Sequence, residues 1–393
     1  MYKINFKNPI HVHFIGIGGI SMSGLAEILL KENFTISGSD SKESPLTNHL
    51  ESLGATVFYG QKASNIIEGI DVVVYTAAIH EDNEEFAEAK RQGLPMLSRA
   101  ELLGQLMTNY ETSIAVSGTH GKTTTTSMLS HILLADEQDP TISVGGILKA
   151  IGGNIRVGNS GVFVTEACEY TNSFLHFFPK LAIVLNIDAD HLDFFKDLDD
   201  IRNSFHKFAQ ILPEDGTLVI NAEIPNWEEI TKDLKCNIVT YGMEEGAEYT
   251  AANISHDEYG NAAFDVIRAG ENLGRIQLSV TGDHNISNAL STIAAANILD
   301  IPFASMQKGL ASFQGTNRRF EYKGERNGFT IIDDYAHHPT EIKATLTSAQ
   351  NYPHKDIWCI FQPHTYTRTN YTSSQILYEI GIIKDYEEKC ISL

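Results

Sequence analysis

Short runs rich in Val and Ile alternate with stretches of helical spacing over most of the chain. In the first part such runs lie at 10–15, 35–40, 55–59 and 71–79, with helical patterns between them. Strands that alternate with helices are typical of α/β units with parallel sheets. We therefore predict a small βα domain over residues 1–108, with the strand at 71–79 buried on both faces.

The alternation continues beyond a polar linker at 106–112. Predicted strands follow at 161–165, 181–187, 216–221, 237–241, 275–280, 329–334 and 356–361, with a helix at 340–349. The length allows two or three domains with their own cores. We predict three: residues 1–108, 109–314 and 315–393.

One glycine turn stands out because a lysine and a threonine begin the helix after it. Residues 118–124 read Gly-Thr-His-Gly-Lys-Thr-Thr, between an apolar run and a helical pattern. Backbone N–H groups and the helix dipole attract anions there, Lys122 suits terminal phosphates, and Thr123 suits magnesium. We predict a phosphate loop, although the first glycine of the standard pattern falls at Val116. An ordinary turn, the alternative, leaves a lysine unexplained where the dipole disfavours cations.

Polar residues stand where two later strands end. Glu166 follows the strand at 161–165, and Asp188, Asp190 and His191 follow the strand at 181–187. Ligands of open parallel sheets bind beyond the carboxyl ends of the strands, where the phosphate loop also lies. We therefore expect Glu166 to hold magnesium and His191 to be a second metal ligand. Taken singly, each is equally consistent with a helix cap or a surface residue.

The first glycine turn, at residues 16–22, approximates a dinucleotide fingerprint with Ser21 at the third glycine position. It predicts a nucleotide at a helix N-terminus, with Asp40 near a ribose or base. A Rossmann-like half without a ligand remains an alternative. A nicotinamide-dependent oxidoreductase is another, but it does not explain Lys122 or the acids at the strand ends.

Two later signals are weaker. Asn285 and Asn288 lie three residues apart in a predicted helix, so they share a face and could hold an amide-like edge. Helix capping is the open alternative. His337 and His338 are adjacent, which would fit a metal, but we favour a polar loop over a cleft with one histidine packed inward.

Composition argues against several classes of protein, namely nucleic-acid-binding, membrane-spanning and secreted proteins. The formal net charge of −21 argues against a nucleic-acid surface. The sequence has no apolar run long enough for a membrane span and no secretory signal at its start. Its four cysteines are scattered, which indicates reduced thiols in a cytoplasmic protein.

Several separated motifs, taken together, resemble the Mur ligase family of peptidoglycan synthesis. They lie at residues 16–24, 37–40, 118–124, 166–169, 186–191, 282–285, 318–320, 333–341 and 362–368. The resemblance implies an α/β protein of three domains. A Rossmann-like N-terminal domain would hold the UDP-sugar, a central P-loop ATPase-like domain ATP, and a truncated Rossmann-like C-terminal domain the amino acid.

The resemblance also implies site residues, position by position. The UDP-sugar would meet Gly16, Gly18, Gly19, Ser21, Met22, Ser39 and Asp40. ATP would meet Gly118, Thr119, His120, Gly121, Lys122, Thr123 and Thr124, with Asn285 and Asn288 at adenine, Arg319 at the phosphates and Asp334 at the ribose. Thr123 and Glu166 would bind one Mg²⁺ and His191 a second. Lys122, Glu166, His191 and Arg319 would be catalytic, and Tyr335, His338, His364 and Arg368 would face the amino acid.

The implied reaction is the ATP-dependent joining of L-alanine to the lactyl carboxylate of UDP-N-acetylmuramate. The carboxylate attacks the γ-phosphorus, and the amine then displaces phosphate from the acyl phosphate through a tetrahedral intermediate. A related ligase acting on recycled peptides is the alternative within the family.

The family pattern stops after Thr369, because residues 370–393 match none of the helix and βα units expected there. We expect an incomplete C-terminal domain with an exposed sheet edge and an unfilled core. A truncated, catalytically weak protein that only binds UDP-sugar or ATP is therefore a further alternative.

Overall fold

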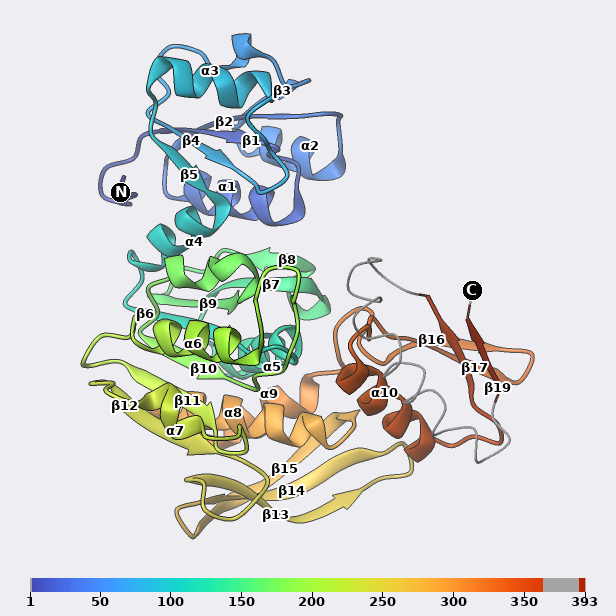
Figure 1. Cartoon of the computed structure of the whole chain (residues 1–393). Helices are drawn as coiled ribbons and strands as arrows, with labels where there is room; N and C mark the ends of the chain where they lie inside the picture. Colours follow the sequence, from blue (N-terminus) through green and yellow to red (C-terminus); the bar gives the residue numbers. More distant parts are fainter. Residues whose placement is uncertain (1, 363–388, 393) are drawn as a thin grey trace.

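The computed structural model describes residues 2–362 and 389–392. Three α/β units follow one another along the chain (Figure 1): a blue unit at the top, a green and yellow central unit, and an orange to red unit at its side. The predicted α/β class is confirmed. The boundaries at 108/109 and 314/315 stay predictions.

The first unit is a five-stranded parallel sheet in the order β3-β2-β1-β4-β5. Its strands are β1 (His11–Ile15), β2 (Thr35–Asp40), β3 (Thr56–Tyr59), β4 (Val72–Tyr75) and β5 (Met96–Ser98). Its helices are α1 (Ile20–Lys31), α2 (Pro45–Ser52), α3 (Glu84–Gln92) and α4 (Arg99–Met107), with a 3₁₀ turn η1 (Ala63–Asn65). The prediction of a strand to residue 79 was too long, and β5 was missed because three residues carry too little pattern.

The central unit is built on a ten-stranded sheet in the order β15-β14-β13-β12-β11-β10-β6-β9-β7-β8. The strands are β6 (Thr112–Ser117), β7 (Thr141–Leu148), β8 (Gly153–Arg156), β9 (Val162–Ala167), β10 (Leu181–Val184), β11 (Thr217–Asn221), β12 (Asn237–Tyr241), β13 (Tyr249–His256), β14 (Asn261–Arg268) and β15 (Glu271–Thr281). The helices are α5 (Lys122–Ala135), α6 (Leu198–Ala209), α7 (Trp227–Thr231), α8 (His284–Ile298) and α9 (Phe303–Ser312), with 3₁₀ turns η2 (Lys149–Ile151) and η3 (Tyr170–His176).

The strand before the phosphate loop lies in the middle of this sheet. β6 pairs in parallel with β9 on one side and with β10 on the other. Ser117 is opposite Ala167 in one pairing and opposite Val184 in the other. Parallel strands in register end at one edge, so the segments after β6, β9 and β10 converge there. Glu166 was expected just after its strand but lies within β9, opposite Val116.

The third unit is small. β16 (Glu321–Arg326) and β17 (Phe329–Asp333) form an antiparallel pair, α10 (Pro339–Asn351) follows, and β18 (Trp358–Phe361) pairs in parallel with β19 (Lys389–Ser392). Ile342 and Leu346 of α10 are its buried apolar centre. The predicted non-matching tail lies outside the described residues except at 389–392.

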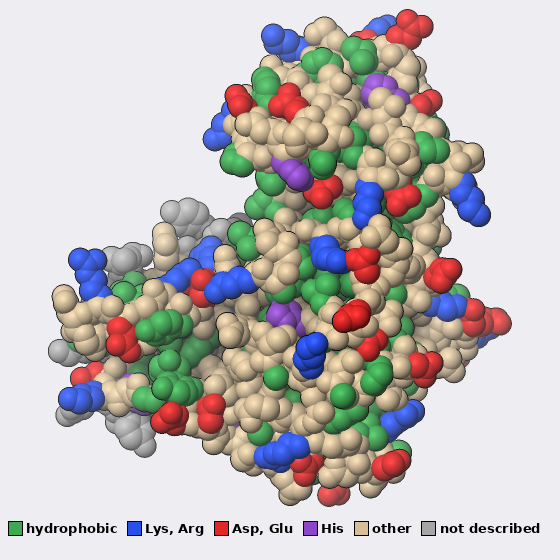
Figure 2. Space-filling model, turned by 180° about the vertical axis from the view of Figure 1, so that it is seen from behind, with side chains coloured by type: hydrophobic (Ala, Val, Ile, Leu, Met, Phe, Trp, Pro, Cys, Tyr) green, Lys and Arg blue, Asp and Glu red, His purple; other side chains and the backbone are tan. Residues whose placement is uncertain are grey.

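The back of the molecule (Figure 2) shows acidic and basic side chains interspersed among apolar ones. On this face the basic side chains form no continuous patch of the kind that binds nucleic acid. Among the helices of the described part, none combines the length and apolarity that a membrane crossing needs.

Gly309 of α9 tests the packing behind the phosphate loop. A Cβ at Gly309 would lie 2.5 Å from the Ile132 Cα of α5, a backbone atom that cannot rotate away. We expect Gly309→Ala to lower the free energy of unfolding by about 1–3 kcal/mol through overpacking. Gly153→Ala is the control, because its nearest neighbour is 3.9 Å away and we expect a change within about 0.5 kcal/mol. Urea unfolding measures both, and equal stabilities would contradict the close α5–α9 contact.

Candidate active site

The phosphate loop depends on two glycines in the left-handed region. Gly118 has φ 143° and Gly121, the residue before α5, has φ 84°. A Cβ on Gly118 would lie 2.9 Å from Leu185 Cβ, and one on Gly121 would lie 2.9 Å from Asn288 Oδ1. Only glycine fits both the backbone conformation and the available space. The loop therefore packs closely against the ends of β10 and α8.

Lys122, the first residue of α5, is held inside this loop. Its Nζ donates to the carbonyls of Gly118 (2.5 Å) and Thr119 (3.0 Å) and forms an ion pair with Glu169 Oε2 at 2.9 Å. Burial opposes the charge of Lys122, but Glu169 outweighs it, so the pKa of Lys122 lies above its ordinary value. The lysine is thus kept cationic where a nucleotide phosphate is expected.

Oxygen ligands for a hard cation face each other beside Lys122. Thr123 Oγ1 donates to Glu166 Oε2 at 3.1 Å, and the Gly145 N–H donates to Glu166 Oε1 at 2.5 Å. Burial raises the pKa of Glu166. A hydroxyl and a carboxylate are the ligands that Mg²⁺ prefers, so this pair fits the predicted magnesium site.

Glu169, for which no role was predicted, links Lys122 to the predicted second metal ligand. His191 Nε2 lies 3.8 Å from Glu169 Oε1, and the His191 ring stacks on Tyr170 with ring centroids 4.3 Å apart. Glu169 is only 2% exposed. Its place in the Glu-Ala-Cys-Glu motif at 166–169 was the available signal. Lys122, Glu166, Glu169 and His191 therefore lie around one edge of the sheet.

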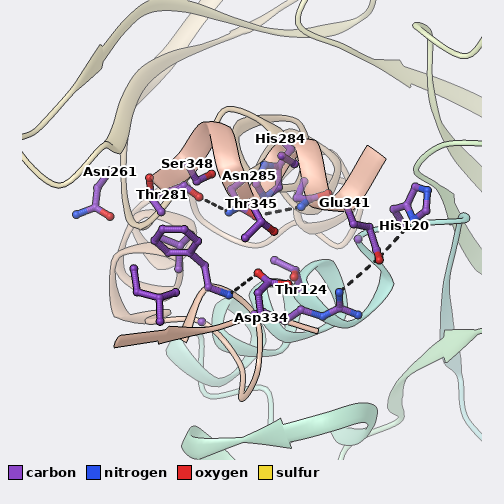
Figure 3. A pocket seen from close by; sticks show the side chains of 18 of the residues that line it. His120, Thr124, Asn261, Thr281, His284, Asn285, Asp334, Glu341, Thr345 and Ser348 are labelled. Carbon is purple, nitrogen blue, oxygen red and sulfur yellow. Dashed lines mark hydrogen bonds and ion pairs between the residues drawn. The ribbon is translucent and has the colours of Figure 1, made fainter. Parts of the chain in front are cut away.

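A cavity of about 440 Å³ opens beside the loop (Figure 3). The predicted ATP residues that line it are His120, Gly121, Thr124, Asn285, Asn288, Arg319 and Asp334. They come from the phosphate loop, from α8 and from the third unit. The structure thus brings together around one hollow residues that are up to 214 positions apart, from His120 to Asp334.

The two asparagines are buried side by side on α8. Asn285 Nδ2 donates to the Thr281 carbonyl at 2.7 Å, and Asn288 Nδ2 donates to Asn285 Oδ1 at 3.1 Å. This chain fixes the amide orientation without a side-chain cap at the helix start. Opposite them, Asp334 accepts the N–H groups of Phe320 (2.8 Å) and Ala336 (2.7 Å), and burial raises its pKa.

His120 connects the phosphate loop to the third unit. Its Nε2 lies 3.2 Å from Asp188 Oδ2, its Nδ1 lies 3.4 Å from Glu341 Oε1, and its ring is 4.5 Å from that of His338. Burial opposes its charge, but Asp188 and Glu341 raise the pKa of His120 to about 9. Glu341 lies in the motif at residues 333–341, but no role was predicted for it. Burial opposes its charge too, but His120, Arg319 and His337 hold the pKa of Glu341 below its ordinary value.

A metal between His120, Asp188 and His338 is disfavoured. Ligand atoms of the three residues lie within 4.8 Å of one another. Both ring nitrogens of His120 face carboxylates, Nε2 facing Asp188 at 3.2 Å and Nδ1 facing Glu341 at 3.4 Å, so a metal would have to displace the proton that these pairs stabilise on the ring. We therefore keep the proposed magnesium ligands at Thr123 and Glu166.

The residues expected to face the amino acid are only partly described. Tyr335 lies under the guanidinium groups of Arg318 and Arg319, 4.8 and 5.9 Å from its ring centroid. His338 caps α10 by accepting the Thr340 N–H at 3.3 Å and is half-buried, as is His337. His364 and Arg368 lie outside the described residues.

The glycine turn of the first unit is closed by Asp40. The Gly18 N–H donates to Asp40 Oδ2 at 2.9 Å, and Gly16 has φ 84°. Ser21 Oγ accepts from Arg99 at 3.1 Å, and Ser39 donates to the buried Glu85 at 2.5 Å. Two other predicted residues lie at the start of α1: Gly19 is its N-cap, and the Met22 side chain is buried in the core.

Comparison with known proteins identifies relatives that are similar to this chain over most of its length. Three family models match in sequence order: Mur ligase family, catalytic domain (residues 11–111), Mur ligase middle domain (116–296) and Mur ligase, glutamate ligase domain (318–378). The chain is 61% identical over 369 residues to UDP-N-acetylmuramate–L-alanine ligase of Agathobacter rectalis, covering 94% of this chain and 80% of that relative.

Two solved structures share the architecture. UDP-N-acetylmuramate-alanine ligase from Thermotoga maritima aligns with a TM-score of 0.78 at 29% identity, covering 98% of this chain and 90% of that one. A murein peptide ligase from Psychrobacter arcticus aligns with a TM-score of 0.75 at 26% identity and the same coverages. Together with the family models, they confirm the predicted three-domain architecture.

The charge on His120 gives a pH-dependent prediction. Its pKa of about 9 in the folded protein exceeds the value near 6.5 of an unfolded histidine. The stabilisation it contributes is therefore complete below about pH 6.5 and is lost as the pH rises through about 9. We expect NMR titration of the imidazole, assigned with His120→Gln, to give a midpoint near 9. A midpoint near 6.5 would contradict the paired arrangement.

Proposed function

Because the chain belongs to the Mur ligase family, we propose that it joins L-alanine to the carboxylate of UDP-N-acetylmuramate at the expense of ATP, in peptidoglycan synthesis. The name and 61% identity of the Agathobacter rectalis relative support this substrate pair. The observation that carries the proposal is the cavity shared by the phosphate loop, the α8 asparagines and the third unit. Its lining supplies partners for the parts of a nucleoside triphosphate.

The groups that line the cavity and those of the adjoining phosphate loop and sheet edge each have a proposed task. The Asn285 and Asn288 amides would hold adenine, the Asp334 carboxylate would accept hydrogen bonds from the ribose hydroxyls, and Lys122 and Arg319 would neutralise the phosphates. Thr123 and Glu166 would hold Mg²⁺, with His191 and its neighbour Glu169 beside a second ion. Bound Mg²⁺ supplies charge neutralisation at the phosphate oxygens.

The reaction needs two anions to meet, a carboxylate and a triphosphate. In the proposed mechanism the lactyl carboxylate attacks the γ-phosphorus, ADP leaves, and the L-alanine amine attacks the acyl phosphate and releases phosphate. Lys122 and Arg319 lower the repulsion in the first step because they stay cationic in a largely buried site. Residues of the third unit, among them Arg319, Asp334 and Glu341, line the cavity and would limit the access of water, which otherwise hydrolyses an acyl phosphate.

The UDP part of the substrate would bind to the first unit. Here the glycine turn and Asp40 form a compact rim at the carboxyl ends of β1 and β2, where nucleotides bind in such sheets. We propose Gly16, Gly18, Gly19, Ser21, Met22, Ser39 and Asp40 as its contacts. Tyr335, His338, His364 and Arg368 remain our proposed contacts to the amino acid.

A second candidate function is ligation of a recycled peptide. The Psychrobacter arcticus murein peptide ligase supports it with a TM-score of 0.75. The two functions differ only in the amine substrate, so one assay separates them.

The assay measures ADP release with Mg²⁺, ATP and UDP-N-acetylmuramate. We expect release to require L-alanine, because a bound acyl phosphate turns over only when an amine attacks it. Release that requires a muropeptide-type peptide instead would establish the second candidate. The absence of release with either amine would refute both ligase functions and leave the weak binding protein as the explanation.

Lys122→Ala separates the two nucleotide sites. We expect ATP turnover to fall at least about 100-fold, because a preorganised charge at the phosphates is lost. UDP-N-acetylmuramate binding should change less than about twofold, because its site lies on another unit. Isothermal titration of the UDP-sugar and a coupled ADP assay measure the two effects. Loss of both together would contradict separate sites.

A further inference from the structure

Glu341, on the first turn of α10, divides its two carboxylate oxygens between different tasks. Oε2 accepts the N–H groups of His337 (3.2 Å) and His338 (3.4 Å), which completes the capping box of α10. Oε1 faces away from the helix, 3.4 Å from His120 Nδ1 and 3.5 Å from Arg319 Nη1. Figure 3 shows Glu341 beside His120, with a dashed line between the two side chains.

A helix cap alone explains the two backbone N–H contacts of Oε2, but neither the ion pair of Oε2 with His337 Nδ1 at 3.3 Å nor the contacts of Oε1. A capping box needs one acceptor oxygen, and serine, threonine or glutamine satisfies comparable positions. The Oε1 contacts instead join the phosphate loop, which carries His120, to the third unit, which carries Arg319. The Glu341 side chain is only 12% exposed, so both interactions operate away from bulk water. Both oxygens of the Glu341 carboxylate therefore have polar partners.

The contact leaves Arg319 able to bind a phosphate. A guanidinium has five N–H donors in a planar fork, and the pair with Glu341 uses Nη1. Fixing one edge of a guanidinium sets the direction of its other donors. Arg319 lines the cavity together with His120 and Glu341, so those donors have a nucleotide site within reach.

We propose that Glu341 is a positioning residue for the nucleotide phosphates. Through Oε1 it holds Arg319 and the His120 loop in a fixed relation, so that the two units present their cations to one triphosphate. This inference rests on the proposed function only in taking ATP as the ligand of the cavity. It adds a role for a residue that touches neither the adenine side nor the metal ligands.

Glu341→Gln separates the two tasks. The Gln side-chain oxygen can still cap α10, but the side chain no longer presents a negative oxygen to His120 and Arg319. We expect the affinity for ATP to fall about tenfold while the affinity for AMP stays within about twofold, because the loss concerns the outer phosphates. Isothermal titration with both nucleotides on the same preparation gives the ratio, in which any unfolded fraction cancels.

Three further variants test how the effect is transmitted, and the first of them tests whether it passes through Arg319. In an Arg319→Ala background, Glu341→Gln should lower the ATP-to-AMP affinity ratio by less than about twofold further, because the residue it positions is gone. Glu325→Gln, an exposed glutamate of β16, is the matched control and should leave the ratio unchanged. His120→Ala removes the other partner without touching the α10 cap and should lower the ratio in the same direction.

An unchanged ratio in Glu341→Gln and His120→Ala would overturn the proposal. Tighter ATP binding by Glu341→Gln would also overturn it, because the carboxylate would then be a competitor of the phosphates. A full tenfold loss in the Arg319→Ala background would show that Glu341 does not act through Arg319. These binding measurements do not depend on ligation. If the wild-type chain showed no ligase activity, the proposed function would be refuted, but the role of Glu341 in ATP binding could still be tested.

Discussion

The candidate site depends on the parallel pairing of β6 with β9 and β10. Because Ser117 is opposite both Ala167 and Val184, the phosphate loop, the Glu166–Glu169 segment and the segment after β10 leave the sheet at one edge. A shift of one residue in the pairing of β6 with β9 would turn Glu166 to the opposite face of the sheet. Side chains on both faces of these strands are buried, Ile114, Val116 and Val164 on one face and Ala115 and Phe163 on the other, so such a shift would disrupt the packing on both sides of the sheet. Packing of the core thereby determines that Glu166 lies beside the phosphate loop.

This arrangement buries charged side chains, which lose hydration free energy. The structure offsets that loss by pairing each buried cation with carboxylates. A lysine and a carboxylate removed from water each lose several kcal/mol of hydration, which their attraction recovers only with good geometry. Lys122 has that geometry, with Glu169 at 2.9 Å and two backbone carbonyls. The same reasoning applies to His120 between Asp188 and Glu341. Both pairs keep cations in place before a triphosphate arrives, so binding need not assemble them.

The features that could be predicted from the sequence are those set by short-range interactions. The phosphate loop is local, since its glycines, Lys122 and Thr123 are consecutive, and its strand and helix were found. The position of Glu166 near the phosphate loop followed from the rule that neighbouring parallel strands end at the same edge of a sheet. Glu169 and Glu341 were missed because their partners lie 47 and 221 positions away, Lys122 and His120 respectively, and periodicity carries no such information. β7 and β8 were missed because their glycines and polar residues interrupt the strand pattern.

The three units are joined by different kinds of contact, and this difference bears on how a ligand enters. The first and central units share one apolar core, which contains Val12 and Leu29 together with Phe163 and Phe205. The third unit has its own small core around Ile342 and Leu346, and it meets the central unit through His120–Glu341, through His338 against the Ala189 carbonyl at 3.3 Å and through the Tyr259–Tyr352 ring pair. Polar interfaces between domains open more readily than apolar ones because water replaces their contacts. The cavity lies at this polar junction, so part of its lining comes from a unit that shares no apolar core with the sheet edge that carries the phosphate loop.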